Sequence, residues 1–151
     1  MIKIYLPKHA VVEKLKIVQF GGVCLLKGVV YQATVTNTRG DIETYVGVAK
    51  NFKQRYSKHK ASLKKQTSEN STTLSTYYWS EKNAGRGPSI KWDILEKNIP
   101  TFNPVYRNCR LCVREKFYIA FHPGKATLNS RNEIFSHCRH KGGCLIETPP
   151  D

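Results

Sequence analysis

Residues 28–49 read GVVYQATVTNTRGDIETYVGVA, and this stretch decides the fold. β-Branched residues dominate 29–36 and 42–49, and the pentapeptide 37–41 between them consists of residues that turns favour. Two apolar runs joined by a short turn segment predict an antiparallel β-hairpin.

Each run contains one tyrosine, Tyr31 or Tyr45. Tyrosine is common in strands, so either residue alone indicates ordinary packing. Because the two positions differ by an even number, their side chains share a face only if the connecting loop has an odd number of residues. A two-residue Arg39-Gly40 loop would place them on opposite faces, whereas an odd loop such as Arg39-Gly40-Asp41 would align them. We predict the odd loop.

The rest of the chain predicts helices around this hairpin and one further strand. The expected elements are a helix capped by Asn51 and ending near Lys65, a polar loop over 66–73, a helix over 74–83, a strand over 89–95, a helix over 111–121, and a last helix from Asn129 or Ser130 toward Cys138. This order predicts an α+β domain in which helices flank a small three-stranded antiparallel sheet. We expect the domain to span 28–141, between an N-terminal extension or truncated linker over 1–27 and a tail over 142–151.

The charge of the chain predicts a polyanionic partner. Its 151 residues include 25 Lys and Arg against 11 Asp and Glu, a net charge of +14 that is typical of nucleic-acid binding. Positive residues are densest in 50–65, so we expect Lys50, Lys53, Lys58 and Lys60 to contact DNA. No uncharged apolar run approaches the roughly 20 residues of a membrane span, and we expect no membrane partner.

Three further residues have side chains that could carry chemistry. Arg55 and His59 are four residues apart and therefore share one face of the predicted helix. An arginine is a permanent cation suited to phosphate, and a histidine can accept a proton near neutral pH. Glu115 is the only carboxylate in the predicted helix 111–121. Taken singly, each is typical of a solvated helix surface.

The cysteines predict a metal site. In a chain that lacks a secretory signal pattern, an odd number of cysteines favours a reducing compartment over a disulfide framework. Cys109 and Cys112 have the spacing of a zinc knuckle, and Cys138 with His140 could complete a tetrahedral Cys₃His site. Cys24 is the alternative ligand if that pair does not converge. The competing interpretation is that Cys109 and Cys112 only pack as small apolar side chains at a helix start.

In their order along the chain, these residues resemble the GIY-YIG nuclease family over roughly residues 28–140. The matching positions are Val29-Val30-Tyr31, Tyr45-Val46-Gly47, Arg55, His59, Glu115 in REKFYI and Asn129 in TLNSRNE. The first triplet is VVY rather than GIY, and Val48 stands where repair-type members have a lysine. The joint occurrence is far more specific than any one motif.

The amino-acid sequences of five segments resemble one subgroup of this family, the endonuclease domain of Penelope-like retroelements. In these elements the endonuclease domain follows a reverse transcriptase. The segments are CLLKGVVYQATV, ENSTTLSTYYW, IKWDILEK, CRLCVREK and LNSRNEIFSHCRHK. The resemblance implies a metal-dependent DNA endonuclease that nicks one phosphodiester bond and supplies a 3′ hydroxyl for target-primed insertion. It also implies an upstream reverse transcriptase domain, an intracellular, nuclear location, and a Cys/His zinc motif beside the catalytic core.

The resemblance further implies a role for each polar residue. Glu115 would hold a single divalent cation, Mg²⁺ or Mn²⁺, near the leaving oxygen, and Arg55 would clamp the scissile phosphate. Asn129 would orient groups in the site rather than react.

By the same resemblance, Tyr31 would be the general base for the attacking water, while Tyr45 and His59 position the water or relay its proton. Whether Tyr31 or His59 takes the proton stays open. Two other functions compete with this one: a non-catalytic nucleic-acid-binding module built on the zinc knuckle, and a repair or restriction nuclease on the same fold.

Overall fold

The computed structural model describes residues 27–101, 109–138 and 140. Its elements are β1 (Lys27–Thr36), β2 (Ile42–Asn51), α2 (Phe52–Lys64), the 3₁₀ helix η2 (Gln66–Ser71), α3 (Thr73–Asn83), β3 (Ser89–Glu96), α4 (Arg110–Phe121), and the 3₁₀ helices η3 (Pro123–Lys125) and η4 (Arg131–Phe135). The strands form one antiparallel sheet in the order β2-β1-β3. The predicted α+β class and three-stranded sheet are confirmed. All of the predicted extension except Lys27, and the whole of the predicted tail, lie outside the described residues.

The β1–β2 hairpin has the odd loop that the tyrosine spacing requires. Tyr31 pairs with Gly47 and Ala33 with Tyr45, so both tyrosines project from one face of the sheet. The loop lies one residue earlier than predicted, because the backbone N–H of Asn37 bonds the carbonyl of Asp41 at 3.1 Å and leaves three residues between them. Asn37 Oδ1 also accepts from the backbone N–H groups of Arg39 and Asp41, at 2.9 and 3.0 Å, which stabilises this position of the turn.

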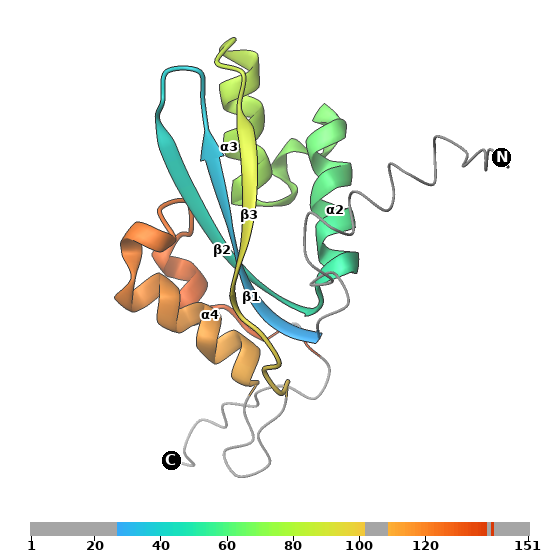
Figure 1. The fold of residues 1–151 in the computed structure, drawn as a ribbon, viewed down its shortest axis with the longest axis vertical. Coiled ribbons are helices and arrows are strands. Elements are labelled where there is room, and N and C mark those ends of the chain that lie inside the picture. Colours follow the sequence, from blue (N-terminus) through green and yellow to red (C-terminus); the bar gives the residue numbers. More distant parts are fainter. Residues whose placement is uncertain (1–26, 102–108, 139, 141–151) are drawn as a thin grey trace, which may run out of the picture.

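Helices cover both faces of the sheet, with α2 and α3 on one side and α4 on the other (Figure 1). The face that carries the tyrosines forms the larger core, whose buried members are Val29, Tyr31, Ala33, Val35, Tyr45, Ala49, Phe52 and Leu74. The opposite face buries Val30 and Val46 against Ile119 of α4 and against Ala126. Burial on both faces explains the continuous apolar runs Val29–Tyr31 in β1 and Tyr45–Val46 in β2.

The α2 and α3 helices begin where the sequence predicts. Asn51 caps α2 by accepting from the backbone of Gln54 at 3.1 Å, and Thr72 forms a capping box with Ser75 at the start of α3. The indole of Trp79 joins the helices by donating to the carbonyl of Ser62 at 2.9 Å.

The last predicted helix is wrong in length. Instead of running toward Cys138, the chain forms only the five-residue η4, whose first turn is closed by a capping box between Ser130 and Glu133. Ser136 has extended dihedral angles (φ −67°, ψ 143°), and the chain beyond it returns Cys138 and His140 to the start of α4. A continued helix would conflict with that return.

A partly buried ion pair at the end of α3 binds the tip of the hairpin through a hydrogen bond from Asn37. The guanidinium of Arg86 bonds both carboxylate oxygens of Glu81 at 2.7 Å, and Asn37 Nδ2 donates to Glu81 at 2.9 Å. These hydrogen bonds lower the pKa of Glu81 to about 2, and the bond from Arg86 has the larger effect.

In the part of the chain that is described, no helix has the length and hydrophobicity needed to cross a membrane.

Candidate active site and metal centre

Tyr31 lies at the centre of the candidate active site. Its side chain is fully buried, and its hydroxyl lies 2.7 Å from Nε2 of His59 and 3.0 Å from Nε of Arg55. The ring covers the backbone of Gly47, where an added Cβ would lie 2.6 Å from Cζ and closer still to the hydroxyl. Glycine at position 47 is therefore a steric requirement of the tyrosine that faces it.

The protonation states of Tyr31 and His59 follow from their burial. Burial raises the pKa of the Tyr31 phenol, and the nearby Tyr45 raises it further. Burial also lowers the pKa of His59 to about 3, with a further contribution from the Arg55 cation. At neutral pH the phenol is protonated and the imidazole is neutral. Arg55 donates to the Tyr31 hydroxyl, and the tautomer of His59 decides which partner donates in the Tyr31–His59 hydrogen bond.

Tyr45 and Trp92 complete the aromatic wall around His59. The Tyr45 ring meets His59 edge-on at a centroid distance of 5.9 Å, and the Trp92 ring lies 5.3 Å from the same imidazole. Burial raises the pKa of Tyr45 to about 12, against the opposing effect of Arg55, which also hydrogen-bonds its hydroxyl. One guanidinium therefore bonds both tyrosines. Trp92 of β3 was absent from the predicted site and carries no motif that would have identified it.

Glu115 reaches the same group of residues from α4, the helix on the other face of the sheet. Its half-buried carboxylate accepts a hydrogen bond from the backbone of Val48 in β2. Burial raises the pKa of Glu115 to about 7, the carboxylate of Glu133 raises it further, and Arg55 acts in the opposite direction. The predicted residues of α2 and α4 therefore interact around the outer strand β2.

Asn129 occupies the free edge of β2. Its Oδ1 accepts from the N–H of Val46 at 2.8 Å, and its Nδ2 donates to the carbonyl of Val46 at 2.9 Å. The neighbouring backbone continues this pairing, since Leu128 N–H donates to the carbonyl of Thr44 at 2.8 Å. The asparagine amide thus replaces part of a fourth strand at an edge that would otherwise be unpaired.

Glu133 is a site residue that the sequence interpretation missed. Its Oε2 accepts from Nδ2 of Asn129 at 3.1 Å, and its Oε1 accepts from the backbone N–H of Ser130 at 2.9 Å. Its charge raises the pKa of both Glu115 and Tyr45. The available signal was the Ser130-x-x-Glu133 spacing of a capping box, which predicts a helix start but says nothing of a nearby active site.

The predicted DNA-contacting lysines do not form one surface. On α2, Lys58 lies about 60° from Arg55 around the helix axis, whereas Lys53 and Lys60 lie about 160° and 140° away. Lys50 belongs to the end of β2, where its charge helps to lower the pKa of His140 after the larger effect of burial. Only Lys58 shares the side of α2 on which Arg55 lies. We expected Arg55 to be exposed from its position on the helix. The structure shows instead that it is half-buried.

The predicted metal ligands Cys109, Cys112, Cys138 and His140 converge on one point. Their ligand atoms all lie within 4.8 Å of one another, and His140 Nδ1 is 3.5, 3.2 and 3.7 Å from the three sulfurs in chain order. Ligand atoms around tetrahedral zinc are separated by roughly 3.5–3.8 Å, given bonds of about 2.0–2.3 Å. The cluster can therefore hold a metal ion such as zinc. The alternative ligand Cys24 lies outside the described residues.

Burial raises the pKa of both the Cys109 and Cys112 thiols, because it disfavours the charged thiolate. A thiolate buried here would therefore need a cation beside it. Both cysteines also pack with Leu111, and Val48 and Ile99 lie against this group. Cys112 is one helical turn before Glu115 on α4, so an ion held here would fix the start of the helix that carries the carboxylate.

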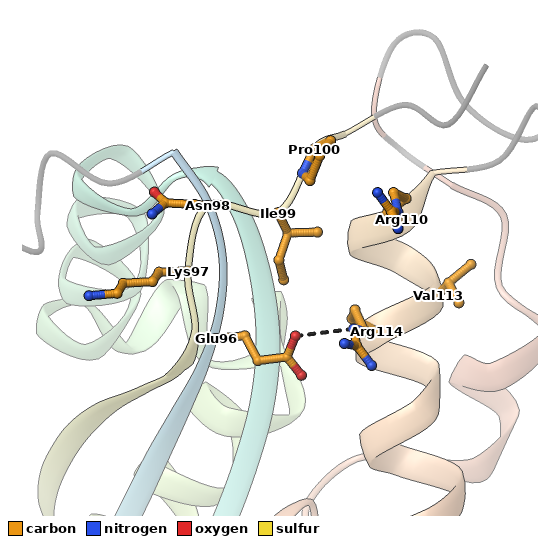
Figure 2. Close-up of a pocket in the computed structure, with 8 residues that line it drawn as sticks. All are labelled: Glu96, Lys97, Asn98, Ile99, Pro100, Arg110, Val113 and Arg114. Carbon is orange, nitrogen blue, oxygen red and sulfur yellow. Dashed lines mark ion pairs between the residues drawn. The ribbon is translucent and has the colours of Figure 1, made fainter. Parts of the chain in front are cut away.

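A cavity of about 460 Å³ lies between the end of β3 and the first turns of α4 (Figure 2). Its lining includes Lys97, Arg110 and Arg114, and Arg114 pairs with Glu96 at 3.1 Å. None of the predicted catalytic residues lines it.

Comparisons with protein-family models, with curated proteins and with solved structures gave no match.

Proposed function

We propose that this protein is a metal-dependent DNA endonuclease of the GIY-YIG type, which nicks a phosphodiester bond. The observation that carries the proposal is the convergence of Tyr31, Tyr45, Arg55, His59 and Glu115 from β1, β2, α2 and α4. Hydrogen bonds join Arg55 to both tyrosines, and charge interactions join it to Glu115. A general base, a phosphate ligand and a carboxylate are the groups that phosphodiester hydrolysis requires.

Arg55 is the phosphate ligand in this proposal. The guanidinium bonds Tyr31 and Tyr45, which orient it, and it has further N–H groups that can donate to a phosphate oxygen. These bonds hold the cation before substrate arrives, so little reorganisation is needed when negative charge develops on the phosphate.

Glu115 suits a divalent cation such as Mg²⁺ or Mn²⁺. It is a half-buried carboxylate whose pKa is raised by burial and by a second carboxylate, Glu133, and a hard cation prefers such oxygen ligands. When bound, an ion of this kind stabilises negative charge on the leaving 3′ oxygen. Asn129 positions the carboxylate of Glu133, since it bonds both Glu133 and the backbone of β2.

The Tyr31–His59 pair is the proton acceptor. When the imidazole hydrogen is on Nδ1, the phenol donates to Nε2 across 2.7 Å, so its proton can pass to His59 as Tyr31 takes one from water. A phosphate bound by Arg55 would bring its negative charge close to Tyr31 and His59, because Arg55 bonds the Tyr31 hydroxyl and the hydroxyl bonds His59. The phosphate charge then raises the pKa of His59 from about 3, and this makes the imidazole a stronger base.

Nicking of supercoiled plasmid DNA tests this function. The unmutated protein with Mg²⁺ or Mn²⁺ should convert supercoiled to open-circular DNA, whereas Glu115→Ala should bind the same DNA without cutting it. If the unmutated protein binds DNA but leaves the plasmid intact with either metal, the rival function applies: a non-catalytic nucleic-acid-binding module. The Cys₃His cluster is the observation that favours this rival.

The retroelement role rests on the sequence resemblance alone. It predicts loosely placed nicks with free 3′ hydroxyl ends that a reverse transcriptase can extend. Mapping the cleaved ends distinguishes the alternatives: a restriction enzyme would cut one short fixed sequence, and a repair enzyme would prefer damaged duplexes. Extension of the nick by an added polymerase tests the 3′ end directly.

A further inference from the structure

One side of α4 presents apolar and cationic side chains to solvent. Arg110, Val113, Arg114, Phe117 and Phe121 recur at spacings of three and four residues and therefore follow one side of the helix; we name this set the α4 outer face. Its three apolar members, Val113, Phe117 and Phe121, are 47%, 39% and 71% exposed. Single exposed apolar residues are ordinary, but an aligned row of them indicates a binding surface.

The charge of this surface is almost entirely positive. From Arg110 to Lys125 the only acidic residue is Glu115, which turns toward the candidate active site. The 460 Å³ cavity shares Arg110, Val113 and Arg114 with the α4 outer face, at its N-terminal end (Figure 2). The one carboxylate that lines this cavity, Glu96, is already paired with Arg114.

The aromatic rings on this side are grouped. The centroids of Phe117 and Phe121 are 5.3 Å apart, and the His122 ring lies 5.3 Å from Phe117. The Arg114 guanidinium lies 6.0 Å from the centre of the Phe117 ring. Rings interleaved with cations form the arrangement that binds both the bases and the phosphates of an unpaired strand.

We propose that the α4 outer face binds single-stranded nucleic acid, with bases stacked on Phe117 and Phe121 and phosphates beside Arg110 and Arg114. A duplex hides its base faces, so the exposed rings select an unpaired strand. A second copy of the chain suits the surface poorly, because each copy would present two arginines, of which Glu96 offsets only Arg114. This inference rests on the proposed function only because both require binding to nucleic acid. It adds that the nucleic acid bound by the α4 outer face is single-stranded.

Binding of a short fluorescent oligonucleotide, measured by anisotropy, tests the proposal against a duplex of the same sequence. Phe121→Ala should weaken single-strand binding about tenfold and leave duplex binding unchanged, and Phe121→Trp should retain it. Arg110→Ala should reduce the dependence of binding on salt, whereas Phe121→Ala should not. The matched control is Ile42→Ala, which removes a 61% exposed apolar side chain from the hairpin, outside this surface, and should change nothing.

Several outcomes would overturn the proposal. Equal loss of single-strand and duplex binding in Phe121→Ala would exclude stacking, and so would full retention of both. Dimerisation of the wild type that Phe121→Ala abolishes would assign the surface to a second copy, and Phe121-dependent binding to anionic vesicles would assign it to a membrane. Glu115→Ala should bind the oligonucleotide normally, so a failure of nicking and a failure of this proposal are separate results.

Discussion

Tyr31 and Gly47 face each other across the β1–β2 ladder, and the tyrosine ring occupies the space that any side chain at position 47 would need. The glycine of the second triplet is therefore coupled sterically to the tyrosine of the first. This contact fixes the phenol between Arg55 and His59, so it joins the geometry of the hairpin to the proposed chemistry.

Gly47→Ala should disable the site through the fold. The added methyl group displaces Tyr31 from a fully buried position, and overpacking of this kind costs roughly 1–3 kcal/mol of unfolding free energy. We expect a lower melting temperature and loss of nicking. The matched control is Gly124→Ala, because no atom lies within 4 Å of an added Cβ there. Equal stability of the two variants would contradict the proposed coupling.

His59 should make the protein less stable in mild acid. Its pKa is about 3 in the folded state and about 6.5 when unfolded, so between these values only the unfolded chain binds the proton. The unfolding free energy should therefore fall as the pH drops below 6.5, by up to about 1.4 kcal/mol per pH unit. Urea unfolding at several pH values measures this slope.

The raised pKa of Glu115 contributes the opposite slope between about 4.5 and 7, so the measurement belongs in a Glu115→Gln background. In that background His59→Gln should reduce the slope between about pH 4.5 and 6.5, whereas His122→Gln, at an exposed position, should preserve it. Below pH 4.5 Glu81, whose pKa is about 2, contributes a slope in the same direction in both variants. A slope that is insensitive to His59 would mean that the imidazole is not buried in solution.

Removal of metal from the Cys₃His cluster should unfold the domain rather than only slow the reaction. The ligands join the start of α4 to the chain after η4, and structural zinc sites contribute binding free energy of roughly 10 kcal/mol to folding. We expect purified protein to contain one equivalent of zinc, and Cys112→Ser to lower both the zinc content and the melting temperature. After strong chelation, Mg²⁺ alone should not restore nicking, whereas zinc followed by Mg²⁺ should. A protein that is fully stable without zinc would leave only the packing role for these cysteines.

Lys58 should contribute more to DNA binding than Lys53. Lys58 lies on the Arg55 side of α2, whereas Lys53 lies nearly opposite. If DNA docks at Arg55, Lys58→Ala should reduce the slope of log affinity against log salt by about 1, which is the effect of one lost phosphate contact. Lys53→Ala should leave the slope almost unchanged. A larger effect of Lys53 would mean that DNA approaches the opposite side of the helix.

Local pattern was sufficient for most of the secondary structure. The helix cap at Asn51 and the alternation in β3 depend on neighbours in the sequence, so they were predicted from it. The capping box at Thr72 also lies between sequence neighbours, but the sequence interpretation placed this residue in a polar loop. The last helix was predicted too long, because helical propensity after Ser130 says nothing about the metal ligands that require the chain to return.

The sequence by itself determined that the two tyrosines could share a face, since strand parity and an odd loop are properties of residue spacing. The spacing of the cysteines and His140 likewise predicted their convergence. Only the tertiary structure decided that the charges of Arg55 and Glu115 interact, that Glu133 adds a second carboxylate, and that burial makes His59 neutral. These features depend on how helices pack against both faces of the sheet, which are long-range contacts that no local pattern encodes.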